Sequence, residues 1–532
     1  MRRVRERRLC LRERAAGASG PSQGPEVVKD QLMEPLRVTN PTTDQLIQSV
    51  PAADAQAADA AMARARAAQP AWAALPFSVR ARTLRRLARA LRDDLTFLDT
   101  LSTESGKPRY EAEGIELFYT LELTRYLTGR AGRRALADDL RHPFVFTNKR
   151  ARVVRHPRGV VAVIGPWNWP LLNNYADCIA PLVAGNAVVL KPSEHTPMTS
   201  LRVADIARAS GVPDGVFQVV AGRGDAGAAL TATADMIFFT GSAATGKRVA
   251  QAAAARLVPV VLELGGKSPM IVLADADLRR AAHAAVWSGF ANSGQVCIRT
   301  ERVIVEDAVA DRFVELAAAE IAQLRQGPPP LGKPDDSDID VGAIAFAPQI
   351  EQAQQHVADA RARGARIVTG GARRSDLPGQ FFAPTLIADA TPDMAVMHEE
   401  TFGPVLPVMR VPDAEAALRA ANDSPMGLSG SIWSGDARRA RALARRLQAG
   451  SVCVNDVLVN YFCVEAPLGG IKASGTGFRH GPEGLRQFCR IETIIEDHPL
   501  LGWLSPLLGR ELTFPYKPRT LRLLRRFMKL FY

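Results

Sequence analysis

The sequence predicts an α/β protein built from two or three domains. The chain has 532 residues, which is too long for one ordinary domain. Val160–Ile164 and Ala187–Leu190 are short, continuous apolar runs of the kind found in buried parallel strands. Helix-forming residues between them complete a βαβ unit, and a second alternation of strands and helices follows Cys297.

The net charge of +12 lies at the two ends of the chain. Residues 1–20 hold seven arginines against two glutamates, and residues 501–532 hold seven Lys/Arg against one glutamate. The body between them is nearly neutral, so we expect no nucleic-acid partner for it. Because no run of about 18 uninterrupted apolar residues is present, we also expect no membrane-spanning helix.

Six cysteines are scattered along the chain, and none forms a Cys-x-x-Cys motif or a cluster with histidine. We therefore expect no metal site. Few, unpaired thiols in a long chain favour a reducing compartment. The arginine-rich start lacks the apolar core of a secretory signal. Together these observations predict a cytoplasmic protein.

The first elements follow from local composition. Residues 1–35 are basic and lack periodicity, so we expect them to be disordered; an extension from a misplaced start codon is the alternative. The stretch VTNPTTDQLIQSVP predicts two short strands around a turn, and Asp54–Ala68 and Val79–Leu98 predict helices. Phe144–Arg155 predicts an extended excursion from the core. After Cys297 the pattern predicts strands at Val303–Glu306 and Gly450–Asn455, helices at Val309–Leu324 and Ile350–Arg363, and a loop at Pro328–Asp340.

Glu263 and Cys297 carry the chemistry that the residues suggest. Glu263 stands near the end of an apolar run beside Gly265 and Gly266, and Cys297 lies in a glycine-containing polar turn. The thiolate form of cysteine is a strong nucleophile, and a carboxylate nearby can act as a general base. A buried structural cysteine and a salt-bridge carboxylate are the alternative interpretations.

Polar and glycine residues gather where the predicted parallel strands end, which is where ligands bind in open α/β sheets. Trp167 and Asn168 lie in the motif PWNWP after the first strand, and Lys191 and Glu194 lie in KPSE after the second. The motif FTGSAATG ends a further strand, where Gly241 allows a tight turn into a helix. The free N–H groups at such a helix start favour a phosphate.

These motifs occur in one order along the chain: PWNWP, KPSE, FTGSAATG, ELGGKSP, GQVC, EETFGP and APLGG. In that order, over about Leu36–Thr493, they resemble the NAD(P)-dependent aldehyde dehydrogenase superfamily. The resemblance implies a Rossmann-like dinucleotide-binding domain, a second α/β catalytic domain, and a β-hairpin oligomerisation element that forms a homodimer or tetramer. The expected division is a basic extension (1–35), an NAD-binding domain (36–141 and 158–264), a catalytic domain (265–460), a bridging element (142–157 and 461–494) and a basic tail (495–532).

The resemblance also implies roles for single residues. Cys297 attacks an aldehyde and passes through a thiohemiacetal and a thioester, while the Asn168 amide and the Cys297 backbone N–H hold the oxyanion. Glu263 activates the hydrolytic water, which argues against transfer to coenzyme A. Glu194 would repel a 2′-phosphate, so NAD is favoured, with NADP as the alternative. The expected cofactor contacts are Trp167, Lys191, Ser193, Glu194, Gly222, Gly227, Gly241, Ser242, Gly246, Leu264, Glu400 and Phe402.

The sequence leaves the substrate open. Leu468 stands where the family more often has Phe, and Phe478 where it more often has Arg, which puts the packing near the substrate mouth in doubt. One candidate is an apolar or long-chain aldehyde; the other is a succinate-type semialdehyde, for which Arg299 would hold the distal carboxylate. Cys463 is a candidate for the wall of the mouth. A non-catalytic membrane- or nucleic-acid-binding scaffold is the alternative of another class.

Residues 499–532 depart from a plain soluble pattern. As a helix, Pro518–Tyr532 would carry its basic residues on about one third of the circumference and its apolar residues on the opposite half. A basic face opposite an aromatic-containing apolar face is typical of a helix that lies in a membrane interface. We expect a peripheral contact with the inner face of the membrane; docking on the protein's own body or on a partner subunit is the alternative.

Overall fold

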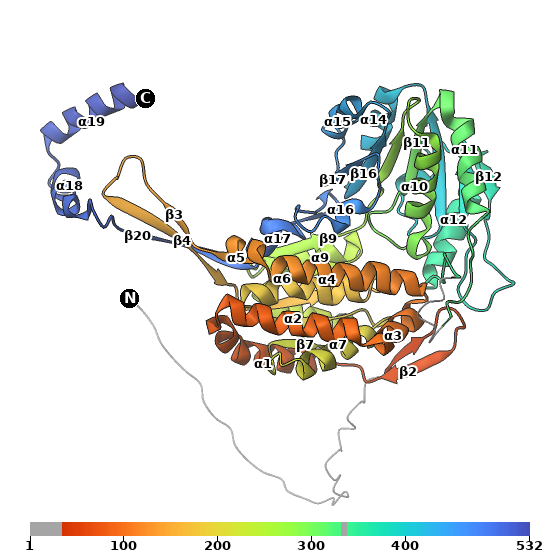
Figure 1. Cartoon of the computed structure of the whole chain (residues 1–532), viewed down its shortest axis with the longest axis horizontal. Helices are drawn as coiled ribbons and strands as arrows, with labels where there is room; N and C mark the ends of the chain where they lie inside the picture. The colour runs from red at the N-terminus through yellow and green to blue at the C-terminus, as the bar shows by residue number, and fades with distance from the viewer. Residues whose placement is uncertain (1–33, 331–337) are drawn as a thin grey trace, which may run out of the picture.

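Two large sheets, each packed against helices, make up the body of the protein, and an arm of three strands reaches away from them (Figure 1). This is a computed structural model that describes residues 34–330 and 338–532. The α/β fold class predicted from the sequence is confirmed. The disorder predicted for residues 1–35 falls almost wholly outside the described residues.

The first sheet is the doubly covered parallel sheet that the βαβ pattern predicts. Its strand order is β19-β9-β8-β5-β6-β7, parallel except for β19, which pairs antiparallel with β9 at the edge. Alternate residues of β5 pack into separate cores on the two faces. The strands are β5 (Val160–Ile164), β6 (Ala187–Lys191), β7 (Phe217–Val219), β8 (Met236–Thr240), β9 (Val260–Glu263) and β19 (Gly475–Thr476).

Local capping explains several helix boundaries around this sheet. Asp54 caps α1, which starts as predicted but continues to Ala74. The single helix predicted at Val79–Leu98 is instead two helices, because Asp94 leaves helical geometry and caps the second. The helices are α1 (Ala55–Ala74), α2 (Phe77–Asp93), α3 (Leu95–Ser105), α4 (Phe118–Leu127), α5 (Arg130–Leu136), α6 (Ala176–Ala184), α7 (Met198–Ala209), α8 (Gly224–Thr233), α9 (Ala243–Ala254) and α17 (Gly481–Arg486).

The second sheet has the strand order β12-β13-β14-β11-β10-β16-β17, parallel except for the antiparallel edge strand β12. The elements predicted after Cys297 match β11, α11, α12 and β17 within three residues. The strands are β10 (Pro269–Val272), β11 (Arg302–Glu306), β12 (Arg366–Thr369), β13 (Thr385–Ala388), β14 (Val405–Val411), β16 (Ser429–Trp433) and β17 (Ser451–Val454). The helices are α10 (Leu278–Phe290), α11 (Asp307–Ile321), α12 (Pro348–Ala362), α13 (Ala395–His398), α14 (Ala414–Asn422), α15 (Ala437–Ala444) and α16 (Val459–Phe462).

The arm joins distant parts of the chain. β4 (Lys149–Pro157) pairs antiparallel with β3 (Asp139–Arg141) on one side and β20 (Cys489–Asp497) on the other, so the predicted excursion is largely a strand. Beyond β20, α18 (Ser505–Leu512) and α19 (Pro518–Phe531) lie beside the arm, away from the body (Figure 1). Throughout the described residues, no helix is both long and apolar enough to cross a membrane. The division into functional domains stays a prediction.

Candidate active site

A cleft of about 610 Å³ opens where the strands of the first sheet end. The last residues of β5, β6, β8 and β9 all lie in its wall, as expected for ligand sites in open α/β sheets. The wall brings together most of the residues that the sequence singles out: Trp167, Asn168, Lys191, Ser193, Glu194, Gly241, Ser242, Glu263, Leu264, Cys297, Glu400 and Phe402.

Three predicted cofactor glycines, Gly222, Gly227 and Gly246, lie outside this wall. A Cβ at Gly222 would lie 2.4 Å from the carbonyl oxygen of Ala53, so chain packing explains this glycine without a ligand. A Cβ at Gly246 would lie 2.5 Å from the leucine that follows β9, which shows how closely α9 approaches the strand end. Gly224, which the sequence analysis did not select, lines the cleft.

One end of the cleft has the features of a dinucleotide site. The Ser242 hydroxyl accepts a hydrogen bond from the Thr245 N–H at 3.3 Å and caps α9, whose remaining first-turn N–H groups favour an anion. Lys191 Nζ donates to two backbone carbonyl oxygens at 2.8 and 2.9 Å and lies 3.7 Å from the partly exposed carboxylate of Glu194. A carboxylate that can accept from ribose hydroxyls and a helix start that can hold a pyrophosphate fit a nicotinamide dinucleotide.

Glu400 and Phe402 are brought to the cleft by close backbone packing. Glu400 Oε1 accepts a hydrogen bond from the Gly266 N–H at 2.8 Å. A Cβ at Gly265 would lie 2.2 Å from the other oxygen of Glu400, which accounts for the paired glycines at this point. The Phe402 ring meets Trp167 edge to face, with ring centroids 5.5 Å apart.

Cys297 follows a tight reversal of the chain. Asn292 and Ser293, just before it, have φ values of 49° and 56°, in the left-handed region. A Cβ at Gly266 would lie 2.4 Å from the Cys297 carbonyl oxygen, so the motifs ELGG and GQVC touch. Burial raises the pKa of the Cys297 thiol to about 12, and the positive charge of Arg479 opposes this rise.

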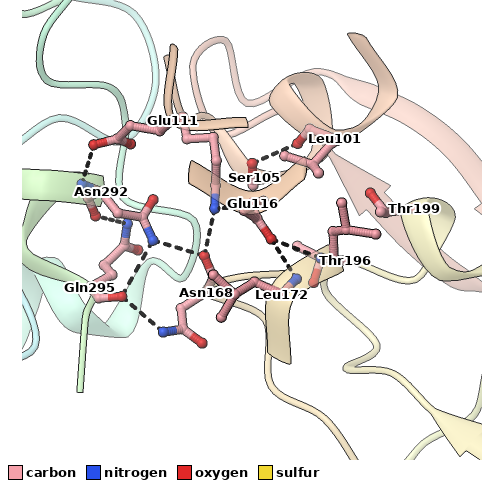
Figure 2. Close-up of polar contacts among 12 residues, drawn as sticks. Leu101, Ser105, Glu111, Glu116, Asn168, Leu172, Thr196, Thr199, Asn292 and Gln295 are labelled. Atoms are coloured by element: carbon pink, nitrogen blue, oxygen red, sulfur yellow. Dashed lines mark hydrogen bonds and ion pairs between the residues drawn. The ribbon is translucent and has the colours of Figure 1, made fainter. Parts of the chain in front are cut away.

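Asn168 is hydrogen-bonded through both its backbone and its side chain (Figure 2). Its carbonyl oxygen accepts from Lys107 Nζ at 2.9 Å and from Asn292 Nδ2 at 2.8 Å. Its side-chain Nδ2 donates to the carbonyl oxygen of Gln295 at 2.9 Å. Because an amide nitrogen carries two hydrogens, one donor remains for a substrate oxygen in the cleft.

A buried ion pair anchors the loop that carries Asn168. Lys107 Nζ lies 2.5 Å from Glu116 Oε1, and both side chains are 0% exposed. Glu116 also accepts from two backbone N–H groups that follow PWNWP, and Glu111 accepts from the Asn292 N–H at 2.6 Å (Figure 2). One segment therefore fixes both the Asn168 loop and the turn before the cysteine. Sequence reasoning missed these residues because charged residues in a helical stretch resemble a solvated face.

Glu263 is buried at the end of β9. Burial raises the pKa of its carboxyl to about 8; Arg479 opposes the rise and Asp177 adds to it. Arg479 Nε lies 3.7 Å from Glu263 Oε2. Within the described part of the chain, Glu263 Oε1 is buried and has no hydrogen-bond partner, so the fold leaves this oxygen unpaired as a proton acceptor.

A second, narrow cavity of about 40 Å³ also meets Cys297, and it shares only Cys297 and Asn173 with the cleft. An adjoining cavity of about 360 Å³ shares three residues with it, Ile115, Trp287 and Ala291. The sequence analysis did not select this set, because such residues look like ordinary core. Besides Cys297 and Asn173, the narrow cavity is lined by Ile115, Trp169, Leu172, Trp287, Ala291, Val296, Ile298, Leu458, Tyr461 and Phe462.

The structure contradicts Arg299 as a contact for a substrate carboxylate. Its side chain is 0% exposed, lies 2.5 Å from Glu301 and donates to the carbonyl oxygens of Gly289 and Val405. It lines neither the cleft nor the narrow cavity, because its side chain enters the core of the second sheet. Cys463, the candidate for the mouth, is exposed and lies outside both walls.

Sequence comparison identifies relatives over most of the chain. The profile of the aldehyde dehydrogenase family matches residues 27–494. The 4,4′-diapolycopene aldehyde oxidase of a Methylomonas species is 40% identical over 462 residues, which cover 86% of this chain and 84% of that protein. A protein of Mycobacterium bovis named as a succinate-semialdehyde dehydrogenase that uses NADP+ is 36% identical over 475 residues, covering 88% of this chain and 90% of the relative.

Solved structures also resemble this chain over most of its length. The aldehyde dehydrogenase of Mycobacterium tuberculosis complexed with NAD+ superposes with a TM-score of 0.82 at 34% identity, covering 87% of this chain and 95% of the other. An NADP-dependent enzyme of E. coli gives a TM-score of 0.83 at 34% identity with the same coverage. The chain therefore belongs to the aldehyde dehydrogenase family and is an NAD(P)-dependent enzyme rather than a non-catalytic scaffold.

Proposed function

We propose that this enzyme oxidises an apolar, elongated aldehyde to its carboxylic acid with NAD. The apolar wall of the narrow cavity at Cys297 carries this proposal. Its lining residues bear no charge, and burying a distal carboxylate there without a partner is strongly unfavourable. The adjoining cavity of about 360 Å³ extends this space, but its wall includes charged residues, among them Glu320, Arg325 and Asp340, so the uncharged wall is that of the narrow part.

The two relatives suggest different substrates. One is named for 4,4′-diapolycopene aldehyde and the other for succinate semialdehyde. A semialdehyde needs a cation for its second carboxylate, and Arg299 is paired with Glu301 in the core. The apolar cavity and the occupied arginine both favour the first class.

The proposed reaction begins with Cys297 Sγ in its thiolate form, which attacks the aldehyde carbon. Hydrogen bonds from Asn168 Nδ2 and the Cys297 N–H stabilise the oxyanion that forms. A nicotinamide held in the cleft would supply the acceptor for a hydride, and loss of the hydride from this carbon leaves a thioester on Cys297. Glu263 then takes a proton from water as the water attacks the thioester, which releases the acid and the thiolate.

The cleft favours NAD over NADP. Glu194 lies in the wall, 3.7 Å from Lys191, where its carboxylate can accept from the hydroxyls of an adenosine ribose. A 2′-phosphate at the same place would meet the negative charge of Glu194. We infer that this repulsion sets the cofactor preference.

The value of kcat/KM is expected to rise with the length of saturated aldehydes from butanal to octanal. Each buried methylene contributes about 0.8 kcal/mol, which corresponds to roughly a fourfold step in kcat/KM. NADH absorbance follows the reaction. Succinate semialdehyde is the matched comparison for butanal, since both have four carbons. A higher kcat/KM for the semialdehyde than for butanal would contradict an apolar substrate.

We also infer that the arm joins copies of the chain into a homodimer or tetramer. On β20, Ile491 and Ile495 are 70% and 66% exposed although the strand pairs with β4 along its length. Large apolar side chains in a row on an exposed sheet face are typical of a protein interface.

The second partner that we propose is an anionic membrane surface, bound through α19. The apolar half of α19 is open, with Leu523 at 67% and Leu530 at 77% exposure. The apolar surface continues onto the loop before β4, where the Phe144 ring lies 5.7 Å from the Phe531 ring. The opposite third of the helix carries basic residues that complement anionic lipid headgroups: Arg519, Arg522, Arg525, Arg526 and Lys529.

The full chain is expected to float with vesicles that contain phosphatidylglycerol, and a chain ending at Asp497 is expected to stay at the bottom of the gradient. Reversing three charges on α19, with Arg522, Arg525 and Arg526 each changed to Glu, should also abolish flotation. The matched control reverses three exposed arginines of α15 and its C-terminal cap: Arg438, Arg441 and Arg445. Equal flotation of the full and shortened chains would refute the proposal. So would a shortened chain that changes only its oligomeric state, because a second copy would then cover the apolar face.

A further inference from the structure

Arg479 is a buried cation beside the general base, and the sequence analysis did not select it. It lies between β19 and α17 and is 5% exposed, whereas the preceding Phe478 is 47% exposed. The family more often has an arginine at position 478. This chain has Phe478 there and an arginine at the next position, with its side chain buried.

Several side-chain oxygens hold the guanidinium of Arg479 by accepting its hydrogen bonds. Nη1 lies within hydrogen-bond distance of three acceptors, which share its two hydrogens: Asp177 Oδ1 at 2.9 Å, Asn173 Oδ1 at 2.8 Å and the Tyr461 hydroxyl at 2.6 Å. Nη2 donates to Thr240 Oγ1 at 2.5 Å. A planar guanidinium with several fixed partners has little freedom to move. Its position relative to the cleft is therefore defined by the fold.

These partners connect Arg479 to both walls around the nucleophile. Asn173 lines the cleft and the narrow apolar cavity, and Tyr461 lines the apolar cavity. The remaining nitrogen, Nε, faces Glu263 Oε2 at 3.7 Å, which is an ion-pair distance longer than a hydrogen bond. The charge of Arg479 thus acts on Glu263 without tying up the oxygens that must reach water.

We propose that Arg479 is a positioning residue that favours the ionised form of the Glu263 carboxyl and aims it at the Cys297 thioester, and that Asp177 sets how strongly it does so. Asp177 competes for the same cation at 2.9 Å. In a buried site an opposite charge at 4 to 6 Å favours the charged form, and a like charge disfavours it. Arg479 therefore favours the ionised form of Glu263, whereas Asp177 favours its protonated form. This inference rests on the proposed roles of Cys297 and Glu263.

The groups that face Glu263 come from four parts of the chain. Asp177 belongs to α6, Arg479 precedes α17, Tyr119 belongs to α4, and Cys297 ends the catalytic turn. Near neutral pH Asp177 is anionic, because burial raises the pKa of its carboxyl only to about 6. Removing the Arg479 cation should therefore raise the pKa of Glu263, and removing the Asp177 anion should lower it.

The test uses 4-nitrophenyl butyrate, which acylates Cys297 without any dinucleotide. Its first turnover releases 4-nitrophenolate as a burst, and the following steady rate reports hydrolysis of the acyl-enzyme. In the unmodified enzyme this rate is expected to rise with pH to a plateau with a midpoint near 8. Arg479→Gln should move the midpoint up by about 1 to 3 pH units, and Asp177→Asn should move it down.

Arg479→Lys keeps the charge but loses the planar guanidinium that holds it in place, so its midpoint should lie between those of the unmodified enzyme and Arg479→Gln. Midpoints that do not move, or that move in the same direction for Arg479→Gln and Asp177→Asn, would overturn the proposal. If Arg479→Gln does not fold, Asp177→Asn still tests the proposal. A midpoint for Asp177→Asn that equals that of the unmodified enzyme, or lies above it, overturns the proposal. Release of 4-nitrophenolate at an unchanged rate in Cys297→Ala would instead refute the proposed role of Cys297, so the two failures are distinguishable.

Discussion

Replacing Cys297 with alanine is expected to abolish aldehyde oxidation, with a loss of at least about 10⁴-fold in kcat. Alanine removes the sulfur that forms both covalent intermediates, and no other thiol lies in the described walls of the cleft or the narrow cavity. The alanine side chain is smaller than cysteine, so neither wall is obstructed. The measurement is NADH formation with octanal as the substrate.

The matched control is Cys463→Ala, because Cys463 is exposed and outside both walls. This variant should retain full activity. Quenching of tryptophan fluorescence on addition of NAD, with Trp167 in the cleft wall, should persist in Cys297→Ala and show that the cleft is intact. More than about one hundredth of the original kcat in Cys297→Ala would contradict the nucleophile assignment.

The parts of the fold that the sequence predicts well are those determined by short-range pattern. β5 is wholly apolar, and β6 is apolar up to its last residue, Lys191. Strands of this kind must be covered on both faces, so a parallel sheet with helices on each side follows. Motifs at strand ends then fall on one edge of the sheet, which is why Asn168 and Glu263 meet in one cleft. Cys297 reaches the same cleft from the turn between α10 and β11. Helix boundaries were less predictable, because Asp94 is a good cap but also tolerated inside a helix.

The parts that the sequence does not reveal are long-range partners of charged residues. Arg299 is near Cys297 in sequence, yet its contact with Glu301 and two carbonyl oxygens is visible only in the folded chain. Lys107 and Glu116 resemble a solvated pair, but they are buried beneath the Asn168 loop. Gly222 has a motif-like position, yet the nearby Ala53 carbonyl explains it. In each case the partner is fixed by tertiary packing rather than by local spacing.

Replacing Glu263 with glutamine is expected to separate the two halves of the reaction. The amide has almost the same shape but cannot take a proton from water, so hydrolysis of the thioester should slow by about 10² to 10⁴-fold. Attack by Cys297 and loss of hydride do not use this base in the proposed reaction. Rapid mixing with octanal and NAD should therefore show a burst of NADH close to one equivalent per active site, followed by a very slow steady rate.

The raised pKa of Glu263 also predicts how the rate of thioester hydrolysis changes with pH. Because burial raises the pKa of the Glu263 carboxyl to about 8, the carboxylate is mostly protonated below that pH and cannot act as a base. In the unmodified enzyme the rate of hydrolysis should increase as pH rises through about 8 and then level off. The Gln variant has no such group, so its slow rate should lose this rise. A burst followed by an unchanged steady rate would show that another group activates the water. A lost burst would place Glu263 before the thioester, at activation of the thiol.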